Sequence, residues 1–308
     1  MKKLLVFWII IVFFSSFVNA TMISKWSFDT GCNNTFALDD QGNYNGTVTN
    51  AVWNSTGGYD GNGAYWFDGD GDYIELEDIV ELNNVSEFSL LMRLNWTDPT
   101  GNLVPFEKSK DFNERTRFLI ASDLDVYAYI NNEEAGYAAN KSSGLQNNTW
   151  YHMAWVYNGS QATNETRFKL YVDGVERGLE FGNGPIPTRT ANMPGNRSTI
   201  GMSNTFGSNY FEGFIDDVRF YDTALNSSQV LDVYNGSGSS TCVYSSGDWS
   251  VNASDSCSWS SNVDLSGNDW SISGSGTVTS SNVNFSNVNK FTIEGAVFTM
   301  LGGSVTVE

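Results

Sequence analysis

The chain has 308 residues, and its 35 Asp and Glu residues outnumber its 16 Lys and Arg residues, giving a formal net charge of −19. This acidity, with no basic patch in the sequence, excludes binding to nucleic acid or to anionic membranes, because both need clustered Lys and Arg. The length suits one large β domain followed by a smaller unit.

The first 20 residues have the pattern of a secretory signal peptide. Lys2 and Lys3 precede an apolar run over residues 4–14, and Val18-Asn19-Ala20 is similar to a small-residue cleavage site. The run is short for a membrane-spanning helix, which needs ~20 apolar residues. We therefore expect cleavage before Thr21 and no membrane insertion afterwards; a retained N-terminal anchor is the alternative.

Residues 21–236 have the alternation of apolar and polar residues that is typical of half-buried strands, with turn signals such as Asp173-Gly174 and Pro194-Gly195 between them. Many short strands of this kind predict an all-β antiparallel sandwich or jelly roll. A short helix is expected after Tyr221, capped by Ser227 or Ser228. The expected strands are Thr21–Phe28, Ala64–Phe67, Phe88–Trp96, Arg117–Ile120, Asp125–Ile130, Trp150–Tyr157, Arg167–Val172 and Phe211–Tyr221.

The order of several motifs resembles the laminin-G-like, or concanavalin A-like, jelly-roll domain of surface proteins and glycan-binding modules. The resemblance covers about residues 21–236 and implies a jelly-roll fold. It does not by itself specify a function, because one fold hosts many functions. The motifs that carry it are Lys25-Trp-Ser-Phe-Asp29, Gly63-Ala-Tyr-Trp-Phe67, Phe88-Ser-Leu-Leu-Met92, Trp150-Tyr-His-Met-Ala-Trp155, Phe168-Lys-Leu-Tyr-Val-Asp173-Gly174 and Gly213-Phe-Ile-Asp216-Asp-Val218.

The resemblance also implies one structural calcium ion, Ca2+, at an edge of the sandwich. It points to Asp40 and Asn45, which lie in a Gly- and Asn-rich loop, and to Asp216 of the Ile-Asp-Asp-Val strand; Asp29 and Asp72 are further candidates. Carboxylate, amide and backbone oxygens suit calcium, which takes 6–8 oxygen ligands. The alternative is that these carboxylates only stabilise turns.

Aromatic residues are the candidates for ligand binding, because exposed rings stack on the faces of sugars. The tryptophans at 26, 66, 150 and 155 fall in strand-like runs and are expected in the core. Loop position instead favours Tyr137, Phe206 and Tyr210, which have asparagines nearby.

Signals for an enzyme are weak. The single histidine, His152, lies inside a strand-like run without a Gly-x-Ser-x-Gly elbow. Glycosidases of the jelly-roll fold carry a tight Glu-x-Asp-x-x-Glu cluster, and the run Glu75-Leu-Glu77-Asp78 lacks that spacing. We therefore predict no catalytic residues.

The amino-acid composition changes in the C-terminal part, which is rich in Ser, Asn and Val. Residues 237–241 belong to a flexible Gly/Ser linker, and residues 242–308 repeat weakly every 20 or 21 residues, which is typical of β-helix rungs. Chance similarity in a Ser/Asn-rich segment is the alternative. Cys242 and Cys257 lie close enough in sequence to form a disulfide, leaving Cys32 as a buried small residue or as a link to another chain.

These features favour a secreted or cell-surface, non-catalytic module that recognises an extracellular glycan or a surface protein. Fourteen Asn-x-Ser/Thr sequons after residue 20 suggest a glycosylated exterior, although Asn- and Ser-rich loops also create sequons by chance. The rival hypothesis is the targeting module of a polysaccharide-active enzyme whose catalytic part lies in, or beyond, the C-terminal β segment. A structural cell-envelope protein without a small ligand is a third possibility.

Overall fold

The computed structural model describes residues 20–97, 101–133, 136–141, 143–236, 244, 248–252, 258–259, 262–273 and 277–307. Nearly all of the predicted signal peptide, the linker at 237–241 and the predicted Cys242–Cys257 disulfide lie outside the described residues. Cys32 is a buried free thiol whose Sγ accepts a hydrogen bond from the Leu38 backbone N–H at 3.3 Å, which favours its role as a small buried residue.

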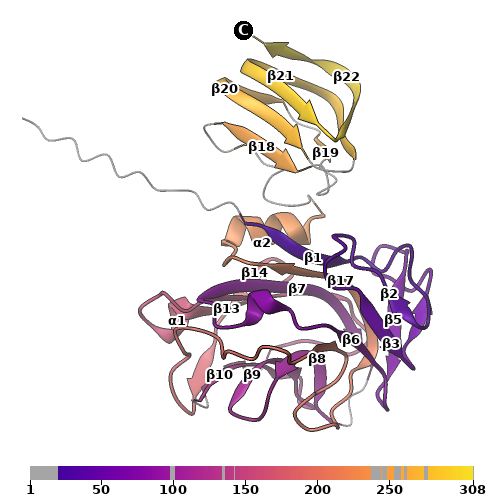
Figure 1. The fold of residues 1–308 in the computed structure, drawn as a ribbon, viewed down its shortest axis with the longest axis vertical. Helices are drawn as coiled ribbons and strands as arrows, with labels where there is room; N and C mark the ends of the chain where they lie inside the picture. The colour runs from indigo at the N-terminus through magenta and orange to yellow at the C-terminus, as the bar shows by residue number, and fades with distance from the viewer. Residues whose placement is uncertain are drawn as a thin grey trace, which may run out of the picture.

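Two antiparallel sheets form the body of the chain and confirm the predicted jelly-roll sandwich (Figure 1). In spatial order, the eight-stranded sheet contains β14 (Val175–Arg177), β13 (Phe168–Val172), β12 (Tyr151–Asn158), β7 (Glu87–Trp96), β17 (Glu212–Tyr221), β5 (Ala64–Asp68) and β4 (Val52–Asn54), with β1 (Met22–Trp26) also paired to β17. The nine-stranded sheet contains β15 (Glu180–Gly182), β11 (Tyr137–Asn140), β10 (Val126–Asn132), β9 (Glu114–Ile120), β8 (Leu103–Ser109), β16 (Ser198–Ile200), β6 (Tyr73–Leu76), β3 (Gly46–Thr49) and β2 (Phe36–Ala37).

The core lies between the two sheets and follows from the alternation along each strand. On β7, Leu90, Met92 and Leu94 belong to this core, whereas Arg93 between them points to the other face of its sheet. Phe118 of β9 stacks on Trp155 of β12 with ring centroids 4.6 Å apart, so one aromatic contact joins the two sheets.

The four tryptophans that were predicted to fill the core divide between the core and the outer layer. Trp26 and Trp155 are buried in the core as predicted, and Trp26 Nε1 donates to the Tyr44 carbonyl at 2.8 Å. The prediction was wrong for Trp66 and Trp150, which are half-buried and contact Phe214 instead. Trp66 lies between two inward-facing residues of β5, so its side chain points to the outer face.

A helix covers the outer face of the eight-stranded sheet. In α2 (Ser227–Tyr234), Val230 and Val233 pack with Leu91, Tyr171 and Tyr221 of the sheet in a second small core. The predicted serine cap was wrong: Asn226 is the cap, because its Oδ1 accepts from the Gln229 N–H at 3.0 Å while Gln229 Oε1 accepts from the Asn226 N–H at 2.8 Å. The other helices in the described part of the chain are η1 (Val80–Leu82) and α1 (Asn164–Arg167).

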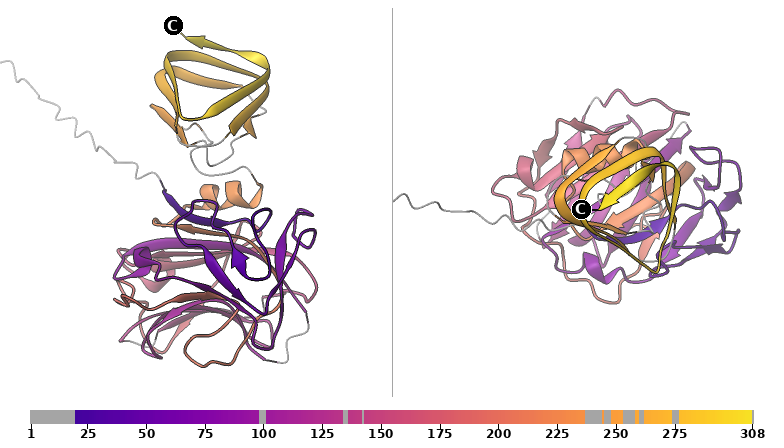
Figure 2. Two further views of the ribbon diagram at one scale, coloured as in Figure 1. Left: turned by 45° about the vertical axis from the view of Figure 1, so that its right-hand side comes forward. Right: turned by 90° about the horizontal axis from the view of Figure 1, so that it is seen from above.

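The C-terminal segment forms parallel strands, as expected of β-helix rungs. The strands are β18 (Trp249–Asn252), β19 (Ser258–Trp259), β20 (Val263–Ser273), β21 (Thr277–Glu294) and β22 (Val297–Val307), and Figure 2 shows them winding into stacked turns. Trp249 pairs with Trp270 and Trp270 with Phe291, so positions 21 residues apart come into register. Their rings stack at centroid distances of 5.4 and 4.4 Å, which builds a separate core.

No helix among the described residues combines the length and apolar character needed to cross a bilayer.

The contact between Phe118 and Trp155 generates a test of the fold. The substitution Phe118→Ala should lower the free energy of unfolding by about 3–5 kcal/mol, because it removes a buried ring between the sheets. The matched control Phe36→Ala, at a 37% exposed ring on the edge strand β2, should cost less than about 1 kcal/mol. Urea unfolding followed by tryptophan fluorescence measures both, and equal losses would contradict the described core.

Candidate functional site

The loop that was predicted to hold calcium is organised by Asp39, which the sequence analysis did not select. The buried Asp39 carboxylate accepts hydrogen bonds at 2.9–3.0 Å from the backbone N–H groups of Lys25, Gln41, Asn43 and Tyr44. The predicted ligand Asn45 is engaged in the same loop, since its Oδ1 accepts from the Asp39 N–H at 2.9 Å. The Gly- and Asn-rich sequence therefore forms a turn closed around one carboxylate.

Asp29, another predicted ligand, interacts electrostatically with two further ones, Asp40 and Asp216. Asp216 is buried on β17, where its Oδ2 accepts from the Tyr59 N–H at 3.0 Å. Burial, followed by the charges of Asp217 and Asp29, raises the pKa of Asp216 to about 8. Burial also raises the pKa values of Asp29 and Asp40. The negative charges of Asp60 and Asp40 add to the effect on Asp29, and that of Asp39 adds to the effect on Asp40.

Asp72 lies apart from this group. Its Oδ2 accepts from the Asp68 N–H at 2.8 Å in the turn between β5 and β6, and its charged neighbours are Asp68 and Asp70. Asp29 thus interacts with both Asp40 and Asp216, whereas Asp72 lies at another turn.

The donor atoms of the three neighbouring aspartates suit calcium, but their arrangement does not form a ligand set. Within the part of the chain that the structure describes, no three His, Cys, Asp or Glu side chains are placed to hold a metal ion. Lys25 occupies the space beside them, with its Nζ 3.7 Å from Asp40 Oδ2. The calcium site therefore stays a prediction.

The predicted aromatic residues fall in two places. Tyr137 is on β11 and contacts Tyr127 and Tyr129 of β10, with centroid distances of 5.8 and 6.0 Å. Phe206 lies in the loop before β17 and contacts Phe112 at 6.1 Å. Tyr210 lies further along the same loop.

Tyr210 lines a hollow of about 330 Å³ at the edge of the sandwich, together with Asp70, Asn102 and Glu212. Its hydroxyl donates to the Gly207 carbonyl at 3.3 Å, which orders the loop. This hollow is separate from the tyrosines of β10 and β11, so the three predicted ligand residues do not form one site.

Two arginines connect Tyr129 with the loop phenylalanines. The Arg115 guanidinium carbon lies 4.3 Å from the Phe112 ring and 4.6 Å from the Tyr129 ring. The Arg117 guanidinium carbon lies 5.1 Å from the Phe206 ring and 5.8 Å from the Tyr129 ring. We call this set the arginine–aromatic patch: Phe112, Arg115, Arg117, Tyr127, Tyr129, Tyr137 and Phe206.

The arginine–aromatic patch lies on the outer face of the nine-stranded sheet. Phe118, Ala128 and Ile130 face the core, so the alternating residues Arg115, Arg117, Tyr127 and Tyr129 point the other way. In Figure 1, β8, β9 and β10 lie on the side of the sandwich opposite to α2. Neither arginine was selected from the sequence, because only the pairing of β9 with β10 brings Arg117 opposite Tyr129.

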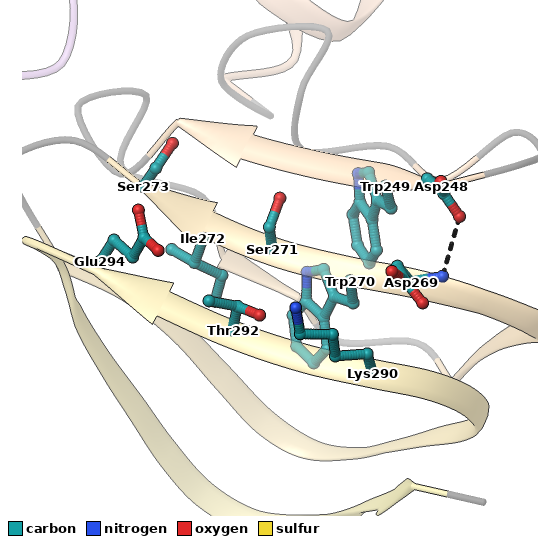
Figure 3. A pocket seen from close by; sticks show the side chains of 10 residues that line it. All are labelled: Asp248, Trp249, Asp269, Trp270, Ser271, Ile272, Ser273, Lys290, Thr292 and Glu294. Atoms are coloured by element: carbon teal, nitrogen blue, oxygen red, sulfur yellow. Dashed lines mark hydrogen bonds between the residues drawn. The ribbon is translucent and has the colours of Figure 1, made fainter.

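The C-terminal unit has a hollow of about 430 Å³ on its parallel sheet, shown in Figure 3. Asp248, Asp269 and Lys290 line it at successive intervals of 21 residues, and Glu294 lies at its other end. The Asp269 backbone N–H donates to Asp248 Oδ1 at 3.0 Å, so one turn of the repeat is tied to the next.

His152 is buried on the outer face of the eight-stranded sheet, close to α2. Burial, followed by the charge of Arg93, lowers its pKa to about 3, so its ring is neutral at physiological pH. Its ring lies 5.8 Å from that of Tyr234, and neither ring nitrogen has a hydrogen-bond partner among the described residues. This environment is that of a packed side chain rather than of a general base.

Comparison with known proteins identifies the fold family. The family model described as the concanavalin A-like lectin/glucanases superfamily matches residues 68–231, which is more than half of the chain. The chain belongs to this superfamily. A search of curated proteins finds no match.

Solved structures share the fold of this superfamily member at low sequence identity. Domain 4 of AbnA, a GH43 extracellular arabinanase from Geobacillus stearothermophilus solved in complex with arabinotriose, is 20% identical with a TM-score of 0.53, over 70% of this chain and 99% of that domain. The binding domain of botulinum neurotoxin serotype D is 13% identical with a TM-score of 0.51, over 74% of this chain. The match spans about half of the neurotoxin domain (54%). Both likenesses show the fold alone.

The raised pKa of Asp216 predicts how stability depends on pH. Because the folded state holds this proton up to pH ~8 and the unfolded state releases it near pH 4, Asp216 favours folding at low pH and loses that contribution as pH rises through 8. Above about pH 7.25, His152 is neutral in the folded protein and mostly neutral in the unfolded chain, so it adds little to the slope. With chelator present, the wild type should lose up to about 1.4 kcal/mol per pH unit below pH 8, and Asp216→Asn should flatten this slope.

The control is Asp70→Asn, at an exposed carboxylate, which should keep the wild-type slope. Thermal or urea unfolding at pH 7.25, 7.6, 8 and 9 gives the profiles. Parallel profiles for Asp216→Asn and the wild type would show that Asp216 is ionised in the folded protein at neutral pH.

Proposed function

We propose that this chain is a secreted or cell-surface, non-catalytic recognition module that binds glycan through the arginine–aromatic patch. The observation that carries the proposal is the collection of Tyr127, Tyr129 and Tyr137 on one sheet face beside two guanidinium groups. Binding sites combine aromatic surface with a few placed polar groups, which suits rings that stack on sugars and donors that reach hydroxyls.

The two outer faces of the sandwich differ in a way that supports this choice. The face of the eight-stranded sheet is occupied by Val230 and Val233 of α2. On the nine-stranded sheet, Tyr127, Tyr129 and Tyr137 remain partly exposed, and Phe112 and Phe206 lie on surface loops. A large extracellular ligand therefore has more access to the second face.

The structural likeness to the arabinanase domain supports a sugar as the ligand, since that domain was solved with arabinotriose. The neurotoxin domain is described only as a binding domain, so a surface protein is the alternative class of partner. A signal-like N-terminus supports secretion.

Calcium is the proposed structural cofactor, at the rim formed by Asp29, Asp40 and Asp216. Its support is electrostatic: the pKa values of all three carboxylates are raised, the charge of Asp40 acts on Asp29 and that of Asp29 on Asp216, and a divalent cation would favour the ionised forms. Binding would require the Lys25 ammonium to move away from Asp40.

A second candidate function is the targeting module of a polysaccharide-active enzyme. The observation that favours it is the hollow on the C-terminal parallel sheet, where Asp248, Asp269 and Lys290 could supply acid–base groups (Figure 3). Hydrolysis of polysaccharides by the full chain, abolished by Asp269→Asn, would support this function over the non-catalytic one.

Glycan binding is tested with an array, followed by calorimetry on the glycans that bind. The double substitution Tyr127→Ala and Tyr137→Ala should weaken binding at least tenfold, because stacking surface is removed from partly exposed positions. The control Tyr73→Ala changes an outward-facing tyrosine on β6 of the same sheet and should bind as the wild type does. Absence of binding across the array, with the protein folded, would contradict the proposal.

Calcium binding is tested by thermal unfolding of chelator-treated protein. Calcium should raise the melting temperature of the wild type, because an ion that binds the folded state alone stabilises it by mass action. Asp216→Asn should remove the rise, and Asp72→Asn should retain it, since Asp72 lies at another turn. An unchanged wild-type melting temperature would show that the rim holds no calcium.

A further inference from the structure

We propose that Arg115 and Arg117 recognise a carboxylate group, so that the ligand of the arginine–aromatic patch is an acidic glycan, such as a chain containing uronic acid. This inference rests on the proposed function, because it specifies the class of glycan that the same sheet face would bind.

The two guanidinium groups are buried together on β9. Arg115 is 2% exposed and Arg117 is 4% exposed, although neither faces the core of the sandwich. Burial lowers both pKa values, and the charge of Arg117 adds to this effect on Arg115. Arginine nevertheless keeps its charge in proteins, so two positive charges lie beneath the aromatic rings.

One carboxylate, that of Glu107, acts on both of these positive charges. Glu107 on β8 is fully buried, and its Oε2 lies 3.8 Å from Arg117 Nε. Its other carboxylate oxygen, Oε1, accepts a hydrogen bond from the Thr205 hydroxyl. The electrostatic neighbours of Arg115 are Arg117, Glu107 and Tyr129, so the patch holds an excess of positive charge inside a chain of net charge −19.

Several donors in the patch have no hydrogen-bond partner. Among the described residues, Arg115 Nε and Nη1 and Arg117 Nη2 are buried without one, and Arg117 Nε has only the ion pair with Glu107 Oε2 at 3.8 Å. A buried donor without a hydrogen bond lowers the stability of the fold. A carboxylate is the acceptor that fits a guanidinium group, because it can accept two parallel hydrogen bonds. A carboxylate would also balance the excess charge.

Acceptors for sugar hydroxyls lie beside these donors. Asn131 Oδ1 and Asn204 Oδ1 are buried without a partner among the described residues. The Asn131 amide nitrogen donates to the Phe112 carbonyl at 3.3 Å, and the Asn204 amide nitrogen donates to the Glu107 carbonyl at 3.3 Å. These hydrogen bonds fix both amide groups, and each leaves its Oδ1 free to accept a hydrogen bond near the arginines.

Phenylalanines from two surface loops lie against the two guanidinium groups. Phe112 is 51% exposed at the turn between β8 and β9, and Phe206 is 47% exposed in the loop between β16 and β17. Since both rings lie on loops, a ligand can displace them without breaking a strand pair. Stacking on Tyr127 and Tyr137 would then place a sugar next to the guanidinium groups.

A purely structural role for the arginines is the competing explanation. In that case, cation–π contacts would only fasten the two loops to the sheet. The structural role predicts a loss of stability on substitution but no preference between acidic and neutral sugars, so binding to matched pairs of glycans separates the two explanations.

The experiment is calorimetric titration of the full chain with three matched pairs of probes. The pairs are oligogalacturonate and its methyl ester, hyaluronan oligosaccharide and its carboxyl-reduced form, and sialyllactose and lactose. At least one acidic probe should bind about tenfold or more tightly than its neutral match, and the preference should shrink from 50 to 500 mM NaCl.

Variants then assign the preference to the arginines. Arg117→Gln should reduce the acidic-to-neutral ratio to near one, and Arg117→Lys should retain part of it because the charge remains while the fork is lost. The control Arg197→Gln, at a half-exposed arginine paired with Glu75, should leave the ratio unchanged. If Arg117→Gln fails to fold, the wild-type comparison of matched probes still decides.

The outcomes distinguish this inference from the proposed function. Equal binding of acidic and neutral probes would overturn the carboxylate inference and leave glycan binding in place. No binding to any probe, together with a silent glycan array, would overturn both.

Discussion

The packing of two sheets face to face is the constraint on which the rest of the structure depends. Each strand commits every second side chain to the shared core, as Leu90, Met92 and Leu94 show on β7. The residues between them must then be accommodated on an outer face. Helix α2 covers one of these faces, and the arginine–aromatic patch occupies part of the other.

This division explains why charged residues are buried outside the core. Arg115 and Arg117 alternate with inward-facing residues of β9, so their depth comes from loops and aromatic rings that lie above the sheet. Asp216 on β17 is buried in a comparable way by the turn that contains Tyr59. Burying a charged side chain is costly, and these side chains add nothing to the core, so their burial calls for a functional explanation.

Much of the fold could be predicted from the sequence, because alternation and turn residues are local signals. The strands at Phe88–Trp96 and Trp150–Tyr157 match β7 and β12 closely, and the 21-residue repeat predicted the parallel pairing of Trp270 with Phe291. Strand β8 was missed, since its buried Glu107 and Lys108 give it no clear alternation. The family resemblance pointed to Asp40, whereas Asp39 anchors the loop; the sequence does not show which of two neighbouring aspartates turns its side chain inward.

The candidate site was less predictable because it combines distant segments. Tyr137 and Phe206 were selected from the sequence, but the arginines that connect their surroundings could be recognised only after β9 was paired with β10. The pairing of strands, rather than any motif, brings these side chains together.

The most direct test of this account is hydroxyl-radical footprinting of the full chain with and without a bound glycan, read by mass spectrometry at single tyrosines. In the free protein, Tyr127 and Tyr137 should react while Tyr171 and Tyr221, which are buried beneath α2, should not. Glycan should protect Tyr127 and Tyr137 and leave Tyr73 reactive. Protection confined to the rim around Tyr59, or reactivity of Tyr171 equal to that of Tyr127, would contradict the assignment of the covered and open faces.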